Sequence, residues 1–159
     1  MPKTALGISR RGQLTLLVAA TVLAPALVVA QEHPHYADAR TYLRTAQMLM
    51  RLPERPNVQL TLKPADDELD AAVREIDRAG VVDRKQMVDR PAVKDTMEPV
   101  DRFRSIVELL HTARNVIQQE ADNPHAELKS AAVKHINAAL EHVHKAAIDA
   151  HLDREIGDF

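Results

Sequence analysis

The chain has 159 residues with a formal net charge of −2 and no cysteine. This length allows one domain with a core of its own, and the absence of cysteine excludes disulfides, covalently attached haem, iron–sulfur clusters and thiol catalysis. The slightly acidic balance argues against nucleic-acid binding, because phosphates attract basic surfaces.

Residues 1–30 have the pattern of a signal peptide. Three basic residues precede an apolar stretch at 14–30, and small side chains lead to a cleavage site after Ala30. A membrane helix needs about twenty apolar residues, so we expect cleavage, with retention as an anchor as the alternative. The mature domain, 31–159, would carry 18 basic and 23 acidic side chains, since residues 1–30 hold three basic and no acidic ones. We expect it to be periplasmic or secreted, without membrane contact.

Four segments show the 3-4 spacing of apolar residues that is typical of helices facing a core. They span 35–51, 65–80, 97–121 and 124–155. "YLRTAQMLM" in the first aligns with "LLHTARNVI" in the third at an offset of 67, and "AAVREIDRA" aligns with "AAVKHINAA" at an offset of 60. The pattern predicts an all-α fold, an antiparallel four-helix bundle built from a duplicated helical hairpin whose first connection is seven residues longer.

Two long connections complete this prediction. In the first, residues 52–64, three prolines bracket "NVQLTLK", and its alternating apolar residues indicate an extended segment. The second covers residues 81–96. These connections are the surfaces that a protein partner would contact.

The stretch "HINAALEHVHKAAIDAH", residues 135–151, contains four histidines. His135 and His142 lie on one flank of the apolar stripe, whereas His144 and His151 lie towards the other. Seven residues separate the members of each pair, or about 10 Å along the axis, which is too far for one ion to be held by one helix alone.

Two helices could share an ion instead. In an antiparallel hairpin His111 is predicted to lie level with Lys134 or His135, and the corresponding positions of the first hairpin are Arg44 and Glu75. Two imidazoles across a groove, completed by a carboxylate or water, suit zinc, copper or nickel. The alternative is that both histidines are partly exposed and bind nothing.

Cleavage after Ala30 would also place His33 third from a free amine, an arrangement that binds Cu²⁺ or Ni²⁺ in a square plane. Alternatively, His33 belongs to a polar lead-in to the first helix. The predicted metal ligands are therefore His33, His111, His135 and His142. The expected cofactors are copper, nickel or zinc, with no haem and no nucleotide.

The mature chain offers little for catalysis. Its glycines are Gly80 and Gly157, which excludes a glycine-rich phosphate loop. Ser105 and Ser130 both lie inside helical patterns, so no nucleophile elbow is present. We predict that the protein is not an enzyme.

The motifs "HPHYADARTYLRTAQMLM" and "DNPHAELKSAAVKHINAAL" resemble those of uncharacterised exported bacterial helical-bundle proteins, which open with HPHY and close with an Asn-Pro…His-Ile helix. More distantly, "NPHAELKSAAVKHINAALEHVHKA" is similar to the periplasmic small metal-binding proteins, four-helix bundles that take up copper and related ions. That resemblance implies ligands at His125, His135, His142 and His144. The first three helices depart from it, because they hold little histidine beyond His111.

Two functions follow from these patterns. The first is an exported, non-catalytic helical-bundle protein that binds divalent Cu, Ni or Zn ions through surface histidines. The alternative is a structural or protein-interaction module without metal, which meets an unknown protein partner through its long connections.

Overall fold

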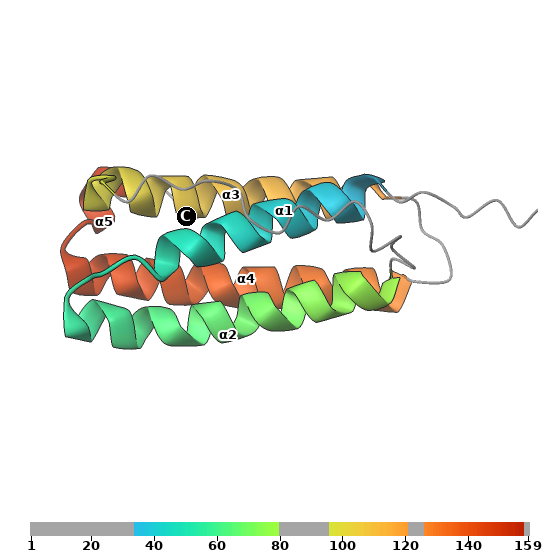
Figure 1. Cartoon of the computed structure of the whole chain (residues 1–159), viewed down its shortest axis with the longest axis horizontal. Coiled ribbons are helices and arrows are strands. Elements are labelled where there is room, and N and C mark those ends of the chain that lie inside the picture. The colour runs from blue at the N-terminus through green and yellow to red at the C-terminus, as the bar shows by residue number, and fades with distance from the viewer. Residues whose placement is uncertain (1–33, 80–95, 121–125, 158–159) are drawn as a thin grey trace, which may run out of the picture. The chain divides into compact units, whose positions relative to one another are not determined.

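The computed structural model describes residues 34–79, 96–120 and 126–157, which form five helices packed against each other (Figure 1). The helices are α1 (Pro34–Met50), α2 (Pro56–Ala79), α3 (Pro99–Gln119), α4 (Ala126–Ala150) and the short α5 (Asp153–Ile156). These described residues contain no strand, which confirms the all-α class. None of the helices among them is both long and apolar enough to cross a membrane.

Each long helix has two long neighbours. The α2–α4 and α1–α3 interfaces are the most extensive, and α1 also packs on α2 while α3 packs on α4. Neighbours run antiparallel, because a contact in each pair joins the region where one helix starts to the region where the other ends: Arg40–Asp77, Arg102–Glu54, Arg55–Ala150 and Lys129–Glu120. The α5 turn folds back against α3 and α4.

The core is built from one apolar stripe on each helix, and many of its positions are alanine. Alanine lets helices approach closely but buries little apolar area, whereas a fully buried leucine, isoleucine or phenylalanine contributes about 1.5–3 kcal/mol. The few large side chains therefore carry most of the apolar stabilisation. Those with the deepest burial include Leu43, Leu69, Phe103, Leu110 and Ile136.

Buried positions recur 67 residues apart in both pairs of helices. Tyr36 and Leu43 of α1 correspond in this way to Phe103 and Leu110 of α3. The same spacing relates α2 to α4: Ala65 to Ala132, Leu69 to Ile136, Ala72 to Ala139, Val73 to Leu140, Ile76 to Val143 and Ala79 to Ala146. The predicted offset of 60 for this second pair is thus one heptad too short, and no longer first connection is needed.

The error arose in residues 57–63, which were expected to be extended and instead form the first turns of α2. Val58, Leu62 and Ala65 are buried together on one side, as helical spacing requires, while Leu60 is 73% exposed. Pro64 lies inside the helix, although it has no N–H to donate to the carbonyl of Leu60. The first connection therefore shrinks to residues 51–55.

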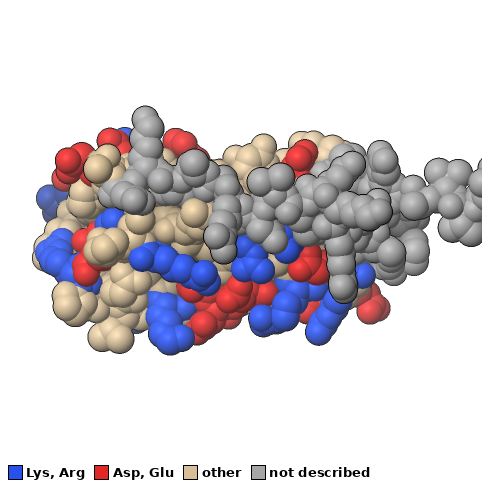
Figure 2. All heavy atoms as spheres, in the orientation of Figure 1, with Lys and Arg blue, Asp and Glu red and all other residues tan. Residues whose placement is uncertain are grey.

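The second predicted connection, residues 81–96, lies outside the described residues except for Thr96. On the exterior of α2, acidic and basic side chains alternate along the helix, and uncharged atoms gather at its N-terminal end (Figure 2). Leu60 of α2 is the most exposed large apolar side chain among the described residues.

The end of α4 is defined by its backbone. His151 adopts a left-handed conformation with φ 62°, its N–H donates to the carbonyl of Ile148, and the N–H of Leu152 donates to that of Ala147. These are the two bonds of a Schellman motif, which stops a helix and satisfies its last carbonyls. The helix predicted for 124–155 is consequently divided into α4 and α5.

Two leucines of α2 test the helical assignment of residues 57–63. An extended segment would place Leu60 and Leu62 on the same face, but the helix buries Leu62 and exposes Leu60. We expect Leu62→Ala to lower the free energy of unfolding by about 2–5 kcal/mol and Leu60→Ala to change it by less than about 0.5 kcal/mol. Urea unfolding followed by circular dichroism measures both, and equal losses would contradict the helix.

Candidate functional site

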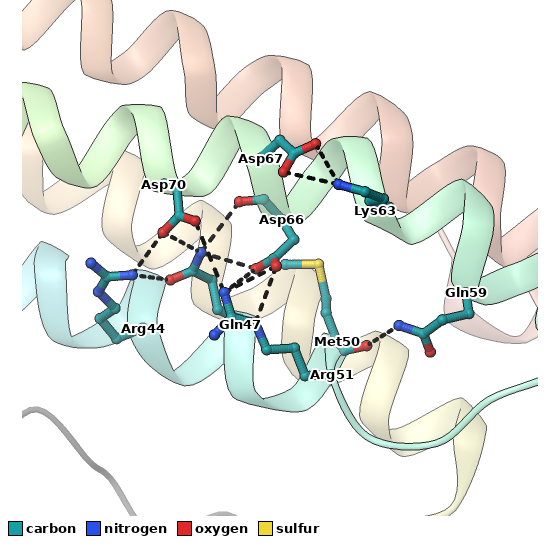
Figure 3. A network of polar contacts seen from close by, with 9 residues as sticks. All are labelled: Arg44, Gln47, Met50, Arg51, Gln59, Lys63, Asp66, Asp67 and Asp70. Atoms are coloured by element: carbon teal, nitrogen blue, oxygen red, sulfur yellow. Dashed lines mark hydrogen bonds and ion pairs between the residues drawn. The ribbon is translucent and has the colours of Figure 1, made fainter.

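A closed polar network joins α1 to α2 (Figure 3). Its centre is Gln47, which is 1% exposed and donates to Oδ1 of Asp66 and Oδ1 of Asp70, both at 3.0 Å. Arg44 donates to Oε1 of Gln47 at 2.7 Å and to Oδ1 of Asp70 at 2.8 Å. Arg44, Gln47 and Asp70 therefore form a triangle in which every edge is a hydrogen bond.

Asp70 is the acidic member of this triangle. Its partial burial raises the pKa, but the hydrogen bonds from Gln47 and Arg44 and the charges of Arg44 and Arg51 outweigh that effect and hold the pKa below the ordinary value. Arg51 itself pairs with Asp66 at 3.0 Å. The network is electrically balanced, which identifies it as a structural clamp between the two helices.

A groove opens beside this clamp, between the end of α1 and the first turns of α2. It has a volume of about 470 Å³ and is lined by Met50, Arg51, Pro56, Gln59, Leu60, Leu62, Lys63 and Asp66. Gln59 donates to the carbonyl of Met50 and so joins the two helices at this end (Figure 3). Apolar atoms predominate in the groove, whereas charged groups stand at its edge.

His135 faces α2. Its Nδ1 lies 2.6 Å from Oε2 of Glu68, and both side chains are about one-third exposed. His142, one heptad further along α4, is half-buried on the same flank of the helix. The prediction that these two histidines share a flank agrees with this arrangement, but the residue that His135 contacts is a carboxylate.

His111 belongs to α3 and faces the side of α4 opposite to His135. Nη2 of Arg114 is 2.9 Å from Nδ1 of His111, and Nη1 of Arg114 donates to Oδ1 of Asn137 at 3.1 Å. A guanidinium can only donate, so Nδ1 accepts and the other ring nitrogen carries the proton. Burial, together with the charge of Arg114, lowers the pKa of His111.

A pocket of about 250 Å³ surrounds this group, lined by His111, Arg114, Asn137, Leu140, Glu141 and His144. The structure thus places His111 near His144, not near His135. Nine residues separate His135 from His144, which is about two and a half helical turns, so the two face opposite ways. The contact between Arg114 and Asn137 also shifts the expected register, because it places His111 level with Leu140.

The predicted pairing of Arg44 with Glu75 is wrong as well. Arg44 contacts Asp70, and Glu75 contacts Arg78 in its own helix. The two observed partners, Asp70 and Asn137, are related by the 67-residue offset. The sequence-based pairing chose Glu75 because it aligned α2 with α4 at an offset of 60, and it chose His135 because it placed the turn between α3 and α4 near Asp122 and Asn123.

The described ranges of the chain contain no group of three or more His, Cys, Asp or Glu side chains that could hold a metal ion. Nδ1 is engaged by Arg114 in His111 and by Glu68 in His135. His33 and His125 lie outside the described residues, so the terminal copper or nickel site remains a prediction.

No protein-family model, curated protein or solved structure matches the chain.

The balanced network makes stability depend on pH through Asp70. Because its folded pKa lies below the ordinary 3.8, its contribution is fully present above that value and is lost as the pH falls through the folded pKa. We expect Asp70→Asn to remove this part of the acid dependence and to cost about 1 kcal/mol at pH 7, a modest loss because the side chain is 37% exposed.

Urea unfolding between pH 7 and pH 2 measures this effect. Asp38→Asn is the matched control, since it removes an exposed carboxylate of α1 outside the network. Parallel acid profiles for wild type and Asp70→Asn would contradict the assignment.

Proposed function

We propose that the protein is an exported, non-catalytic structural module, a four-helix bundle built from a duplicated hairpin that pairs with a second copy of itself along the exterior of α2. The recurrence of buried positions at 67 residues in both helix pairs supports the duplicated hairpin. The antiparallel direction of neighbouring helices supports the bundle. Export rests on the signal-like pattern of residues 1–30.

The observation that carries the proposal is the composition of the outer face of α2. Leu60, Lys63, Asp67 and Ala71 follow one another at intervals of three and four residues, which places them on one line along the helix. Leu60 is 73% exposed and borders the groove, and the side chains of Lys63 and Asp67 are 70% and 67% exposed.

This line is complementary to itself. If two α2 helices pack antiparallel about a two-fold axis at the level of Ala65, Lys63 lies level with Asp67 of the second copy, and Leu60 lies within one residue, about 1.5 Å along the axis, of its Ala71. Symmetry repeats each contact, as isologous dimers require. Apolar area is then buried at both ends of the interface, and opposite charges meet at its centre.

The groove extends this surface towards α1. Exposed apolar residues that stand singly are normal, but Leu60 adjoins a concavity that also contains Met50, Pro56 and Leu62. A second helix lying along α2 covers that concavity. The lining therefore supports an interface at this end of the molecule rather than an isolated exposed side chain.

Divalent metal binding through His33, His111, His135 and His142 remains the other hypothesis. The contact of His111 with Arg114 makes it the weaker one, because a metal would have to displace a cation from Nδ1 of that ring.

Analytical ultracentrifugation of residues 31–159, which contain the whole described core, tests the self-association. We expect a concentration-dependent dimer, and Leu60→Asp should weaken it by about tenfold or more, since a charge would then be placed against Ala71 of the second copy. Ile148→Asp on α4 is the matched control, because Ile148 is 49% exposed and lies off this face.

Charge reversal supplies a second test. Lys63→Glu alone should weaken the dimer, and adding Asp67→Lys should restore it, because the two charges are then exchanged in both copies. A wild-type protein that stays monomeric, or a dimer equally weakened by Ile148→Asp, would contradict the proposal.

A further inference from the structure

The 67-residue offset relates two polar triangles, one in each half of the chain; the first has three hydrogen bonds, whereas the second has two, both made by Arg114. Arg44, Gln47 and Asp70 of the first half correspond to His111, Arg114 and Asn137 of the second. In both triangles, members three residues apart on one helix are hydrogen-bonded, at 2.7 Å for Arg44–Gln47 and 2.9 Å for Arg114–His111. In both, the third member lies on the neighbouring helix and accepts a hydrogen bond. Asp70 accepts from Gln47 at 3.0 Å, and Asn137 accepts from Arg114 at 3.1 Å.

The two triangles differ in charge. In the first, the carboxylate of Asp70 accepts hydrogen bonds from both Arg44 and Gln47 and balances the guanidinium. In the second, the acceptor is the neutral amide of Asn137, and the described residues offer no carboxylate within salt-bridge distance of Arg114. In the first triangle the carboxylate of Asp70 balances the charge of Arg44. In the second triangle Arg114 has no carboxylate partner among its three members.

The second triangle also has donors to spare. Arg114 has five N–H groups, of which the contacts to His111 and Asn137 use two. Nε2 of His111 carries a proton because Nδ1 accepts from Arg114. The amide oxygen of Asn137 accepts from Arg114, which leaves its NH₂ group to donate elsewhere.

The three residues that carry these donors line one pocket. The pocket of about 250 Å³ includes all three residues, and the buried Leu140 supplies an apolar wall. Glu141 and His144 complete the lining. Pockets for drug-sized ligands are about 300–1,000 Å³, so this one suits a smaller molecule.

We propose that this pocket binds the carboxylate group of a small organic acid, which supplies beside Arg114 the negative charge that Asp70 supplies in the first triangle. Arg114 pairs with the carboxylate, and the His111 and Asn137 N–H groups add hydrogen bonds. Glu141 also lines the pocket and repels anions in proportion to their charge, so the pocket favours a monocarboxylate over a dicarboxylate or phosphate. The site lies between α3 and α4 and does not depend on pairing through α2.

A bound metal ion fits this pocket poorly. Arg114 places a fixed positive charge beside His111, and the nitrogen that it contacts is the one with the available lone pair. A cation would have to displace the guanidinium, whereas an anion is attracted by it.

Nuclear magnetic resonance of ¹⁵N-labelled residues 31–159 during an acetate titration tests the site. We expect saturable shifts in the side-chain signals of Arg114 and Asn137, with a dissociation constant in the millimolar range, and smaller shifts with chloride at equal ionic strength. Succinate and phosphate should bind more weakly than acetate, and Glu141→Gln should reduce that difference.

Two reciprocal variants make the test specific. Asn137→Asp installs the carboxylate of the first triangle, so acetate binding should weaken by about tenfold or more while helicity is kept. Asp70→Asn removes the carboxylate from the first triangle, so acetate should now shift the Arg44 and Gln47 side-chain signals.

The proposal is overturned if acetate produces no saturable shift in the wild type, if chloride produces the same shifts, or if Asn137→Asp binds acetate as tightly as the wild type. In Asp70→Asn, acetate must also shift the side-chain signals of Arg44 and Gln47. Without such binding, the correspondence between the two triangles does not extend to their ligands.

Discussion

The constraint on which this fold depends is the scarcity of large apolar side chains on its helices. Alanine occupies many buried positions, so the interior is filled only where the few leucine, isoleucine and phenylalanine residues interlock. Such a core tolerates little sliding of one helix along another. Polar contacts reinforce this restriction. Gln47 of α1 donates to two aspartates of α2, and Arg102 of α3 forms a buried ion pair with Glu54, in the connection that follows α1.

Helical periodicity was enough to predict the number and approximate positions of the long helices, because their apolar stripes are regular. It failed at residues 57–63, where Val58 and Leu62 satisfy both a two-residue and a four-residue period. Pro64 favoured the wrong choice, since proline usually ends a helix. The long stripe from Val58 to Ala79 outweighed that local signal, because its burial against α4 stabilises more residues than one missing hydrogen bond destabilises.

The candidate sites were harder to predict, since they depend on register between helices rather than on period within one. The flank shared by His135 and His142 follows from their seven-residue spacing alone. Which residue His111 meets, by contrast, depends on a displacement of a few residues along α4. Because of this displacement, Arg114 and Asn137 contact each other where a histidine pair was predicted. The predicted cation site is therefore replaced by the anion site that we propose.

Pro64 also has a consequence for the motions of α2. The backbone hydrogen bond that Pro64 cannot donate to Leu60 is missing, so the hydrogen bonding of the first two turns is interrupted at this point. They are tied instead to the far end of the chain, through Arg55 to the carbonyl of Ala150 and through Thr61 to Asp149. Fraying at the last turn of α4 therefore loosens the start of α2, nearly ninety positions earlier in the chain.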